Sequence, residues 1–534
     1  MYVQGKLTKL WILCWLILLN FAAFDLQGQY TNRKSVLNRS QPLTEEGVIV
    51  VKIDESVPVS IPGSDENNNL KEEMLGAIFD LESMVKIESL VNGKVPQARW
   101  AHYGKSKYLR GIYKIRLKQG ENKDDVIRRL QQYHNVIYAE PLFLEQPLLI
   151  PNDPNISQQN HLSVIKAFDA WDVTTGDPSI TIGIIDTGAQ LDNVDLRDNL
   201  AINESDPING LDDDGNGYID DHQGWDFADN DNNPVADFSG HGTHVTGVSS
   251  ATANNNYGVA GVGYNSSFVP LKIFRSSNNS SNNSYEAIIY AADQGYQVIN
   301  LSWGSAGSFS QFNQDVINYA ALERDVVIVA AAGNTNEALD FYPASYDNVI
   351  SVGATDVADN KASFGTFSYK IDLMAPGENV YSTTNGDGFG FRPGSSFAAP
   401  QVAGAAALVR VVFPQWNALQ VAEQIRVTAD DIYDVGTNSQ YFGQLGKGRL
   451  NVFNAVTNTI AKSIRVNELS YADEFGEFAF FDDSVTVQLN FINVLNPTTQ
   501  GTVTVTSESA FVSISNGGLI ELGALNELAT SQLI

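Results

Sequence analysis

The sequence predicts an α/β fold in which helices cover both faces of a mostly parallel β-sheet. Between about residues 160 and 456, short apolar runs alternate with helical segments, a pattern typical of parallel strands joined by helices. The predicted strands are the five apolar runs 180–185, 269–273, 298–301, 326–330 and 349–352. Polar residues follow three of these runs closely, and such sheets bind ligands at the carboxyl ends of their strands. The sequence therefore places a functional site at that edge.

Length and composition indicate a large, acidic and globular chain. The 534 residues suit about three units of ~150 residues each. With 43% hydrophobic and 18% charged residues, the chain can bury large cores. Its net charge of −29 argues against nucleic acid or an anionic membrane as partner, because phosphate binding needs clustered Lys and Arg. The charge is compatible with bound divalent cations and equally with a purely solubilising role.

The first residues have the pattern of a secretory signal peptide. Two lysines precede the apolar run 10–19, and small residues follow it. We assign residues 1–28 to this signal, with cleavage near Ala23 or Gly28. The protein is expected to be secreted, extracellular or at the cell surface, without stable membrane insertion. A single membrane anchor is the alternative, for which the run is short. The only cysteine, Cys14, lies in this segment, so the mature chain is expected to lack disulfides.

Two further units flank the α/β region. Residues 29–149 form a small α+β unit, with predicted strands at 48–53, 111–117 and 136–139 and a helix that opens at Asp124. A stretch punctuated by prolines, 147–154, reads as an accessible linker. Residues 461–534 contain strictly alternating runs, which predict an antiparallel β-sandwich module. Only a few strands are expected there, so an incomplete module is one of the two interpretations.

Three residues far apart in the chain can form a nucleophilic triad. Asp186 ends the first predicted strand, His241 lies in the sequence GHGTH, and Ser396 lies in GSSFAAP. A serine hydroxyl is a weak nucleophile at neutral pH and needs a histidine base, which a carboxylate orients and stabilises. The glycine turn before Ser396 leads into a helix of small residues, predicted at 402–412. The positive end of that helix would face the reacting group.

Acyl transfer also needs hydrogen-bond donors for the oxyanion of its tetrahedral intermediate. Asn334 ends the sequence AAAGN, which follows the predicted strand at 326–330. Its side-chain amide suits this role, together with the backbone N–H of Ser396. The GxSxG elbow of esterases is absent, and the order Asp, His, Ser differs from theirs, so an esterase is a weaker interpretation.

These motifs resemble those of the subtilases, the subtilisin-like serine proteases. The chain has IIDTG, GHGTHVTG, AGN and GSSFAAPQVAG in the order of that family, and the likeness covers roughly residues 150–456. The resemblance implies a peptidase domain at 150–460, folded as a three-layer α/β/α sandwich. It implies four catalytic roles: orienting carboxylate Asp186, base and acid His241, nucleophile Ser396 and oxyanion donor Asn334. The segment that pairs with the substrate backbone as an added strand corresponds to Ser302, Trp303 and Gly304.

The unit at 29–149 is similar to a subtilase propeptide. Such a propeptide acts as folding chaperone and intramolecular inhibitor, which implies a zymogen that processes itself near residues 146–150. Holding a secreted protease inactive, and helping it over a slow non-local folding barrier, is a sound physical reason for such a unit. A permanent accessory domain is the alternative.

An acidic loop is the candidate site for structural Ca²⁺. Its sequence DDDGNGYID, at 212–220, resembles an EF-hand loop, with oxygen ligands expected from Asp212, Asp214, Asn216, the carbonyl of Tyr218, and Asp220. The bidentate glutamate of an EF-hand is missing, so Asp221 or Asp226 is expected to help. The alternative is a solvated acidic turn.

The sequence therefore predicts a secreted subtilisin-like endopeptidase that hydrolyses peptide bonds through an acyl-enzyme on Ser396. We expect a monomer that acts on proteins or peptides and binds no nucleic acid. Two alternatives remain. One is a pseudoprotease that only binds peptides, which the presence of all four catalytic residues disfavours. The other is an adhesin or scaffold whose main function lies in the C-terminal β module.

Overall fold

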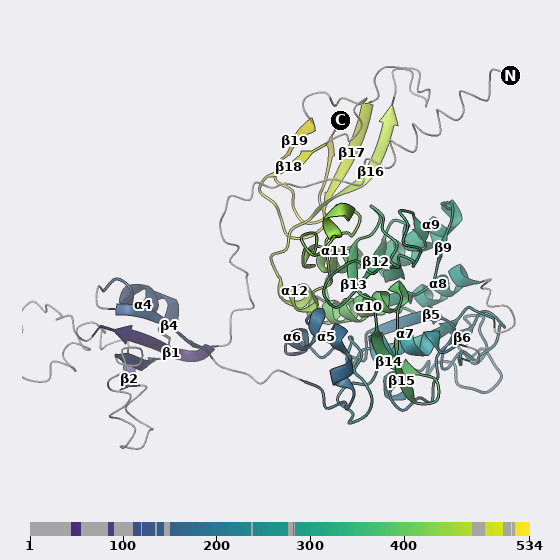
Figure 1. Cartoon of the computed structure of the whole chain (residues 1–534), viewed down its shortest axis with the longest axis horizontal. Coiled ribbons are helices and arrows are strands. Elements are labelled where there is room, and N and C mark those ends of the chain that lie inside the picture. The colour runs from purple at the N-terminus through teal and green to yellow at the C-terminus, as the bar shows by residue number, and fades with distance from the viewer. Residues whose placement is uncertain are drawn as a thin grey trace, which may run out of the picture. The chain divides into compact units, whose positions relative to one another are not determined.

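The computed structural model of the chain describes residues 44–54, 84–89, 111–118, 120–133, 136–143, 150–236, 239–275, 281, 283–472, 486–505, 514 and 518–533 (Figure 1). The expected signal peptide, with Cys14, lies outside the described residues. The chain divides into two compact units: one spans Leu37–Pro147, and the other includes Leu148–Ile534.

The described residues of the smaller unit form an antiparallel sheet and one helix. Its strands lie in the order β2-β3-β1-β4 and comprise β1 (Thr44–Ile53), β2 (Met84–Ser89), β3 (Ile112–Leu117) and β4 (Val136–Phe143). Helix α4 (Lys123–Leu130) begins where the side chain of Asn122 accepts hydrogen bonds from the N–H groups of Asp124 and Asp125. Apolar residues of α4 and of the sheet share one core, so the expected α+β elements form.

The larger unit is built on a seven-stranded parallel sheet. The strands, in spatial order, are β13 (Leu373–Pro376), β12 (Val349–Thr355), β10 (Val327–Ala331), β8 (Val298–Leu301), β5 (Thr181–Asp186), β7 (Ser267–Lys272) and β6 (Trp225–Asp226). All seven pair in parallel. The five predicted strands are confirmed, and β6 and β13 extend the sheet at its two edges.

Helices cover both faces of this sheet (Figure 1). One face packs on α5 (Asn160–Val164), α6 (Ala167–Trp171), α7 (His241–Ser250), α10 (Ser395–Val412), α11 (Ala418–Val427) and α12 (Val452–Thr457). The opposite face packs on α8 (Ser284–Asp293) and α9 (Gln311–Asn318). Neighbouring residues of β5 divide between the two cores, Ile184 in one and Ile185 in the other, as strand alternation requires. The expected three-layer α/β/α sandwich is confirmed.

Helix α10 runs through the centre of the unit and begins earlier than the sequence pattern predicts. It starts at Ser395, after the glycine turn at Gly394, and contains Pro400 within its first turns. Small residues allow close packing: a Cβ on Gly404 would lie 2.7 Å from the backbone nitrogen of Gly263. Among the described residues, α10 alone is long and apolar enough to cross a membrane, and it is buried in this core.

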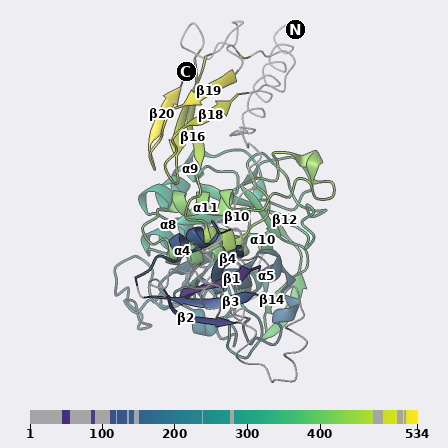
Figure 2. The same ribbon diagram turned by 90° about the vertical axis from the view of Figure 1, so that its left-hand side faces the viewer.

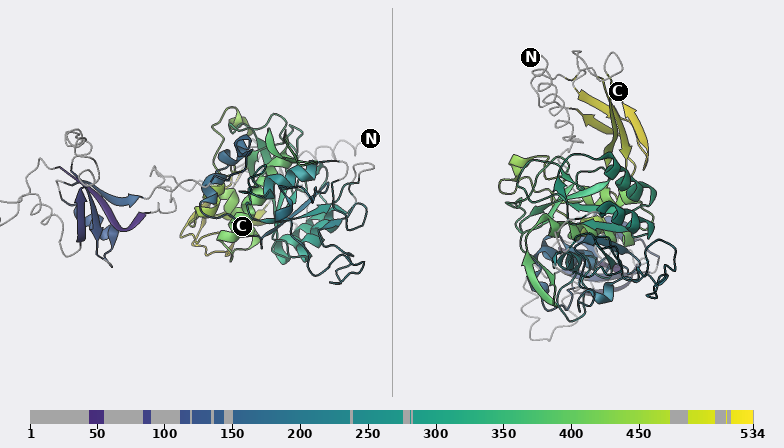
Figure 3. Two further views of the ribbon diagram at one scale, coloured as in Figure 1. Left: turned by 90° about the horizontal axis from the view of Figure 1, so that it is seen from below. Right: turned by 90° about the vertical axis from the view of Figure 1, so that its right-hand side faces the viewer.

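The C-terminal residues form two small antiparallel sheets (Figures 2 and 3). One contains β16 (Ile464–Ala472), β17 (Thr486–Asn493) and β20 (Thr530–Leu533), and the other contains β18 (Gly501–Thr504) and β19 (Leu519–Leu522). Residues from both sheets share an apolar core, which includes Leu489 and Leu522. These strands belong to the larger compact unit.

Candidate active site

Asp186 and His241 form a hydrogen-bonded pair at the carboxyl edge of the sheet. Asp186 is the last residue of β5, and His241 is the first residue of α7. The imidazole Nδ1 lies 2.7 Å from Oδ1 of Asp186, whose carboxylate is buried, and the N–H of Thr187 donates to the same oxygen at 2.7 Å. The pair holds the imidazole in one orientation and leaves its Nε2 for chemistry.

A glycine next to His241 makes this approach possible. A Cβ on Gly242 would lie 2.1 Å from the carbonyl oxygen of Gly188, so any side chain there would push α7 away from the end of β5. The backbone N–H of Gly242 instead donates to the hydroxyl of Thr187 at 3.0 Å. Gly242 of the GHGTH motif is therefore a steric requirement of the Asp186–His241 contact.

The environment of His241 raises its pKa. Burial alone lowers the pKa of this imidazole, but the charge of Asp186 and the hydrogen bond to it act in the opposite direction and outweigh burial. The positive charge of Arg392 opposes the effect of Asp186. The net result is a pKa above the ordinary value of 6.5, because the carboxylate stabilises the imidazolium.

Ser396 lies in the first turn of α10, and its hydroxyl is hydrogen-bonded to the segment after β8. Its Oγ donates to the carbonyl oxygen of Ser302 at 3.0 Å, and no hydrogen bond joins it to His241 in the described structure. The next residue, Phe397, packs against the imidazole with 5.2 Å between ring centroids, so the two helices meet beside the hydroxyl. Rotation of the serine side chain would be needed to complete the triad, and catalytic hydrogen bonds are often incomplete without substrate.

Asn334 presents a free amide N–H group beside the start of α10. Its Oδ1 accepts a hydrogen bond from the backbone N–H of Ser395 at 2.8 Å, which turns Nδ2 outward from an exposed side chain. Nδ2 lies 3.5 Å from the position that a Cβ on Gly394 would occupy. The first N–H groups of a helix have no intrahelical partner, so the N–H of Ser396 is a second donor in this region.

The segment Ser302–Gly304 follows β8 and has no strand partner among the described residues. Ser302 is buried, whereas Gly304 is exposed. A Cβ on Gly304 would lie 2.5 Å from the carbonyl oxygen of Tyr342, so a larger residue would displace this edge. The chain then pairs through β9 (Ser305–Ala306) with β11 (Phe341–Tyr342). The half-buried Trp303 completes the segment, and its indole Nε1 has no hydrogen-bond partner in the part of the chain that the structure describes.

The acidic loop is only partly assembled as the sequence predicts. Asp212 and Asp214 accept backbone N–H bonds from Asn216, and Asp212 also accepts from Gly217. The side-chain amide of Asn216 donates to Asp214 and, at 2.7 Å, to the buried carboxylate of Asp221. These four side chains therefore converge.

Two acidic residues considered for this loop point elsewhere. The carboxylate of Asp220 accepts the N–H groups of Asn209 and Gly210, and within the described residues no hydrogen bond joins it to the four converging side chains. Asp226 forms a buried ion pair with Lys272 at 2.7 Å and so does not help. Within the described residues no three His, Cys, Asp or Glu side chains surround one point as metal ligands, so any cation here would also need amide and carbonyl oxygens.

A second acidic pair, Asp153 and Asp195, was missed by sequence reasoning. Both side chains are buried, and no ion pair is found for either within the described residues. Asn255 links them: its backbone N–H donates to Asp153 and its side-chain amide donates to Asp195 at 2.9 Å. Burial raises the pKa of Asp195 to about 7, despite hydrogen bonds from Val259 and Asn255. No local motif marks these residues, because they are 42 positions apart and meet only through the fold.

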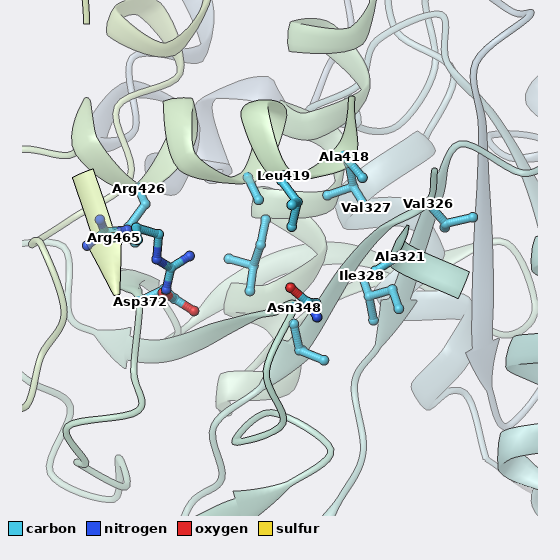
Figure 4. Close-up of a pocket in the computed structure, with 13 residues that line it drawn as sticks. Ala321, Val326, Val327, Ile328, Asn348, Asp372, Ala418, Leu419, Arg426 and Arg465 are labelled. Atoms are coloured by element: carbon cyan, nitrogen blue, oxygen red, sulfur yellow. The ribbon is translucent and has the colours of Figure 1, made fainter. Parts of the chain in front are cut away.

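A pocket lies between α11 and the sheet, away from the catalytic groups. It is lined by residues of β10, β12 and α11 and by Arg465 of β16, and none of the predicted site residues lines it (Figure 4). Figure 4 shows Arg426 and Arg465 next to Asp372 at one end of the pocket. This space marks the junction between the α/β sandwich and the C-terminal strands.

Comparisons with known proteins agree with this geometry. The model of the subtilase family, Peptidase_S8, matches residues 177–448. A thermophilic serine proteinase of Bacillus sp. (strain AK1) is 37% identical over 343 residues, which are 64% of this chain and 77% of that protein. Thermitase of Thermoactinomyces vulgaris is 36% identical over 311 residues, 57% of this chain and 99% of thermitase.

A third relative is named as extracellular. The halolysin-like extracellular serine protease Nep of Natrialba magadii is 30% identical over 337 residues, 63% of this chain and 58% of that protein. The matched part of this chain contains the Asp186–His241 pair, Asn334 and Ser396. The family match and the serine proteinases among the relatives lead to one conclusion: this chain belongs to the subtilase family and is a serine endopeptidase.

Proposed function

We propose that this protein is a secreted endopeptidase that cleaves peptide bonds through an acyl-enzyme on Ser396 and is made as a self-processing zymogen. The observation that carries the proposal is the 2.7 Å bond between His241 and the buried carboxylate of Asp186, on the helix that meets α10 beside Ser396. An oriented imidazole with a raised pKa next to a serine hydroxyl at a helix N-terminus is the arrangement that nucleophilic acyl transfer needs.

Substrate binding prepares the nucleophile. A peptide that pairs with Ser302–Gly304 as an added strand brings its own N–H groups to the backbone carbonyls there. Without substrate, the hydroxyl of Ser396 donates to the carbonyl oxygen of Ser302. A substrate N–H group that binds the same oxygen competes with this bond and releases the hydroxyl. The hydroxyl then turns toward Nε2 of His241.

The first half of the reaction forms the acyl-enzyme. His241 takes the proton of Ser396 as Oγ attacks the carbonyl carbon of the peptide, and Asp186 stabilises the resulting imidazolium. Nδ2 of Asn334 and the N–H of Ser396 donate to the oxyanion. The imidazolium returns its proton to the leaving amine as the C–N bond breaks. The first product leaves, and the acyl group stays as an ester on Oγ.

The second half restores the enzyme. His241 removes a proton from a water molecule, which attacks the ester carbonyl through a second oxyanion held by the same donors. The proton then passes to Oγ of Ser396 as the ester breaks. The carboxylic acid product leaves, and the enzyme needs no cofactor in either half.

The N-terminal and C-terminal parts serve this activity. Residues 1–28 act as signal peptide, 29–149 as inhibitory propeptide, 150–460 as peptidase domain and 461–534 as a C-terminal β module. The signal-like N-terminus and the relative named as an extracellular protease support secretion. The separate compact unit Leu37–Pro147 supports a removable propeptide. The mature enzyme acts as a monomer on proteins and peptides.

Ca²⁺ is proposed as a structural ion. The buried pair Asp153 and Asp195 suits a hard cation best, because two carboxylates without a cationic partner repel each other in a buried place. The acidic loop is the second proposed Ca²⁺ site. Its ligands would come from Asp212, Asp214, Asn216 and the carbonyl of Tyr218, with Asp221 in place of Asp220. A bound ion would neutralise these carboxylates and hold their loops to the core, outside the reaction itself.

The test compares the secreted products of wild type, Ser396→Ala and a control variant, Ser439→Ala, in which an exposed serine is replaced. N-terminal sequencing and intact mass identify what each variant has lost. We expect wild type and Ser439→Ala to begin near residues 146–155 and to digest casein. Ser396→Ala is expected to keep the segment from about residue 29 and to digest nothing. Equal processing of all three variants would show that another protease matures the chain, and casein digestion by Ser396→Ala would exclude Ser396 as the nucleophile.

A further inference from the structure

An arginine that has no partner among the described residues lies beside the catalytic histidine. Arg392 is the last residue of β15 (Gly388–Arg392), which pairs with β14 (Val380–Thr384). It is half-buried, and no hydrogen bond or ion pair of its guanidinium is found within the described residues. A half-buried arginine without a carboxylate is unexpected in a chain of net charge −29, where acceptors are abundant.

The guanidinium is placed by a glycine. A Cβ on Gly240, the residue before His241, would lie 3.3 Å from one terminal nitrogen of Arg392 and 3.2 Å from Oδ1 of Asn385. The absent side chain of Gly240 therefore leaves the space that the guanidinium occupies. Asn385 is itself held by the hydroxyl of Thr243 at 2.7 Å, so the hairpin end is tied to α7. The positive charge is thus held against the helix that carries the catalytic base.

This position is unfavourable for catalysis by itself. The charge of Arg392 lowers the pKa of His241 and so opposes the imidazolium that forms during the reaction. A negative charge on the substrate, placed next to Arg392, would offset this unfavourable effect on the imidazolium. Among the described residues of the site no carboxylate pairs with Arg392, because that of Asp186 is buried and bound to Nδ1 of His241.

The direction of the reaction decides which half of the substrate reaches Arg392. In the proposed mechanism the acyl half pairs with Ser302–Gly304, and His241 gives its proton to the leaving amine. The leaving half of the peptide therefore passes the imidazole, and the guanidinium of Arg392 lies beside Gly240, the residue before that imidazole.

We propose that Arg392 is a specificity residue that binds a carboxylate in the leaving half of the peptide, close to the scissile bond. This inference rests on the proposed acyl-transfer function. The carboxylate belongs to an Asp or Glu side chain or to the C-terminus of a short product, and both offer the two oxygens that a guanidinium binds in pairs. The protein thereby favours cleavage just before acidic residues, although its overall charge is negative.

The experiment measures kcat/KM for peptides that differ only at the first or second residue after the scissile bond, which is Glu, Gln or Lys. We expect wild type to favour Glu over Lys by roughly tenfold, the effect of one charged hydrogen-bonded pair. Arg392→Gln should bring this ratio near one, Arg392→Glu should reverse it, and Arg392→Lys should keep part of it. Arg197→Gln, which removes an exposed arginine elsewhere, should keep the wild-type ratio.

Further substrates distinguish a side-chain carboxylate from a C-terminal carboxylate. They also distinguish failure of this inference from failure of the proposed function. Peptides that end two residues after the scissile bond, as free acid or amide, test the C-terminal carboxylate. A p-nitroanilide substrate has no leaving peptide and reports acyl transfer alone. Equal Glu/Lys and acid/amide ratios in wild type and Arg392→Glu, with the p-nitroanilide still cleaved, would overturn the role of Arg392. Failure of wild type to cleave any substrate would overturn the proposed function and this inference together.

Discussion

The hydroxyl of Ser302 donates to the carbonyl oxygen of Ser396 at 2.7 Å, and the hydroxyl of Ser396 donates back to the carbonyl oxygen of Ser302 at 3.0 Å. Pro400 explains why the first bond exists. In an α-helix the N–H of residue i+4 pairs with the carbonyl of residue i, and proline has no N–H. The carbonyl of Ser396 is therefore left open inside α10. The segment Ser302–Gly304, which is proposed to bind the substrate backbone, is therefore linked to the nucleophile Ser396 through these two hydrogen bonds.

Ser302→Ala is expected to destabilise the protein by about 1–3 kcal/mol, because it leaves the carbonyl of Ser396 without a donor. In a Pro400→Ala background the loss should be smaller, because alanine supplies the helical N–H to the same carbonyl. Urea unfolding of the two single variants and the double variant, all made on Ser396→Ala to prevent autolysis, measures the coupling. Additive losses would show that Pro400 does not govern this bond.

The raised pKa of His241 predicts the pH dependence of activity. Because the imidazole must be neutral to act as base, kcat/KM should rise with pH through a pKa above 6.5. Asp186→Asn removes the charge that raises this pKa and leaves burial and Arg392, which lower it, so the inflection should move to lower pH. The maximum should also fall by roughly 10⁴-fold, as in other serine proteases. An unchanged inflection in Asp186→Asn would exclude the carboxylate as the cause.

The same pair has a consequence for stability. A histidine whose pKa is higher in the folded state stabilises the protein fully below its unfolded pKa of about 6.5, and this contribution is lost as pH rises through the folded pKa. Activity and the stability due to this pair therefore change in opposite directions across that range of pH.

Asn334→Ala should lower kcat with little change in KM. Its amide has one oxygen bound by the N–H of Ser395 and one NH₂ group free for the oxyanion, which exists only in the transition state. In subtilisin the loss of one oxyanion donor lowers kcat by about 10²–10³-fold, and we expect the same order here. Thr335→Ala, a neighbouring change, serves as control. A main effect on KM would indicate ground-state binding instead.

Local patterns predicted the parallel strands well, and they selected Asp186 and His241, which the structure brings into contact, because each pattern depends on residues close in sequence. An apolar run in the sequence indicates the strand that ends at Asp186, and the glycines around His241 indicate the start of the next helix. The beginning of α10 at Ser395 was not predicted, because it includes a proline, and the carbonyl of Ser396 that this proline leaves open is satisfied by Ser302, 94 residues away. The Asp153–Asp195 pair likewise depends on tertiary contacts.

Removal of Ca²⁺ should lower the melting temperature and speed autolysis. A bound ion at 100 times its dissociation constant stabilises the folded state by about 2.7 kcal/mol. If the pair Asp153 and Asp195 is the main site, Asp195→Asn should lose most of the sensitivity to EDTA, and Asp214→Asn should lose a smaller part. Asp213→Asn lies in the same acidic loop outside the proposed ligands and should respond to EDTA like wild type. A melt that EDTA leaves unchanged would exclude structural Ca²⁺.

Glu423 joins the peptidase fold to the C-terminal strands and should be essential for stability. Its carboxylate is fully buried on α11, binds Arg426 and the hydroxyl of Ser463, and lies 3.3 Å from Arg465 of β16. Burial alone would raise the pKa of Glu423, but the charges of the two arginines hold it at about 2. The ion pairs are therefore intact at neutral pH and span the junction drawn in Figure 4.

Glu423→Gln keeps the size of the side chain but removes the charge that pairs with Arg426. Removing one partner of a buried pair typically costs about 3–5 kcal/mol, and the 16% exposure of the Arg426 side chain should make the cost smaller. Because the folded pKa of Glu423 is depressed, its contribution is present above the unfolded value of about 4.5 and is lost as pH falls toward 2. Urea unfolding on the Ser396→Ala background should therefore show a large deficit for Glu423→Gln at pH 7 that shrinks below pH 4. Glu521→Gln, which changes an exposed carboxylate of β19, should stay near wild type throughout. A deficit for Glu423→Gln that is independent of pH would mean that packing, and not charge, holds the junction.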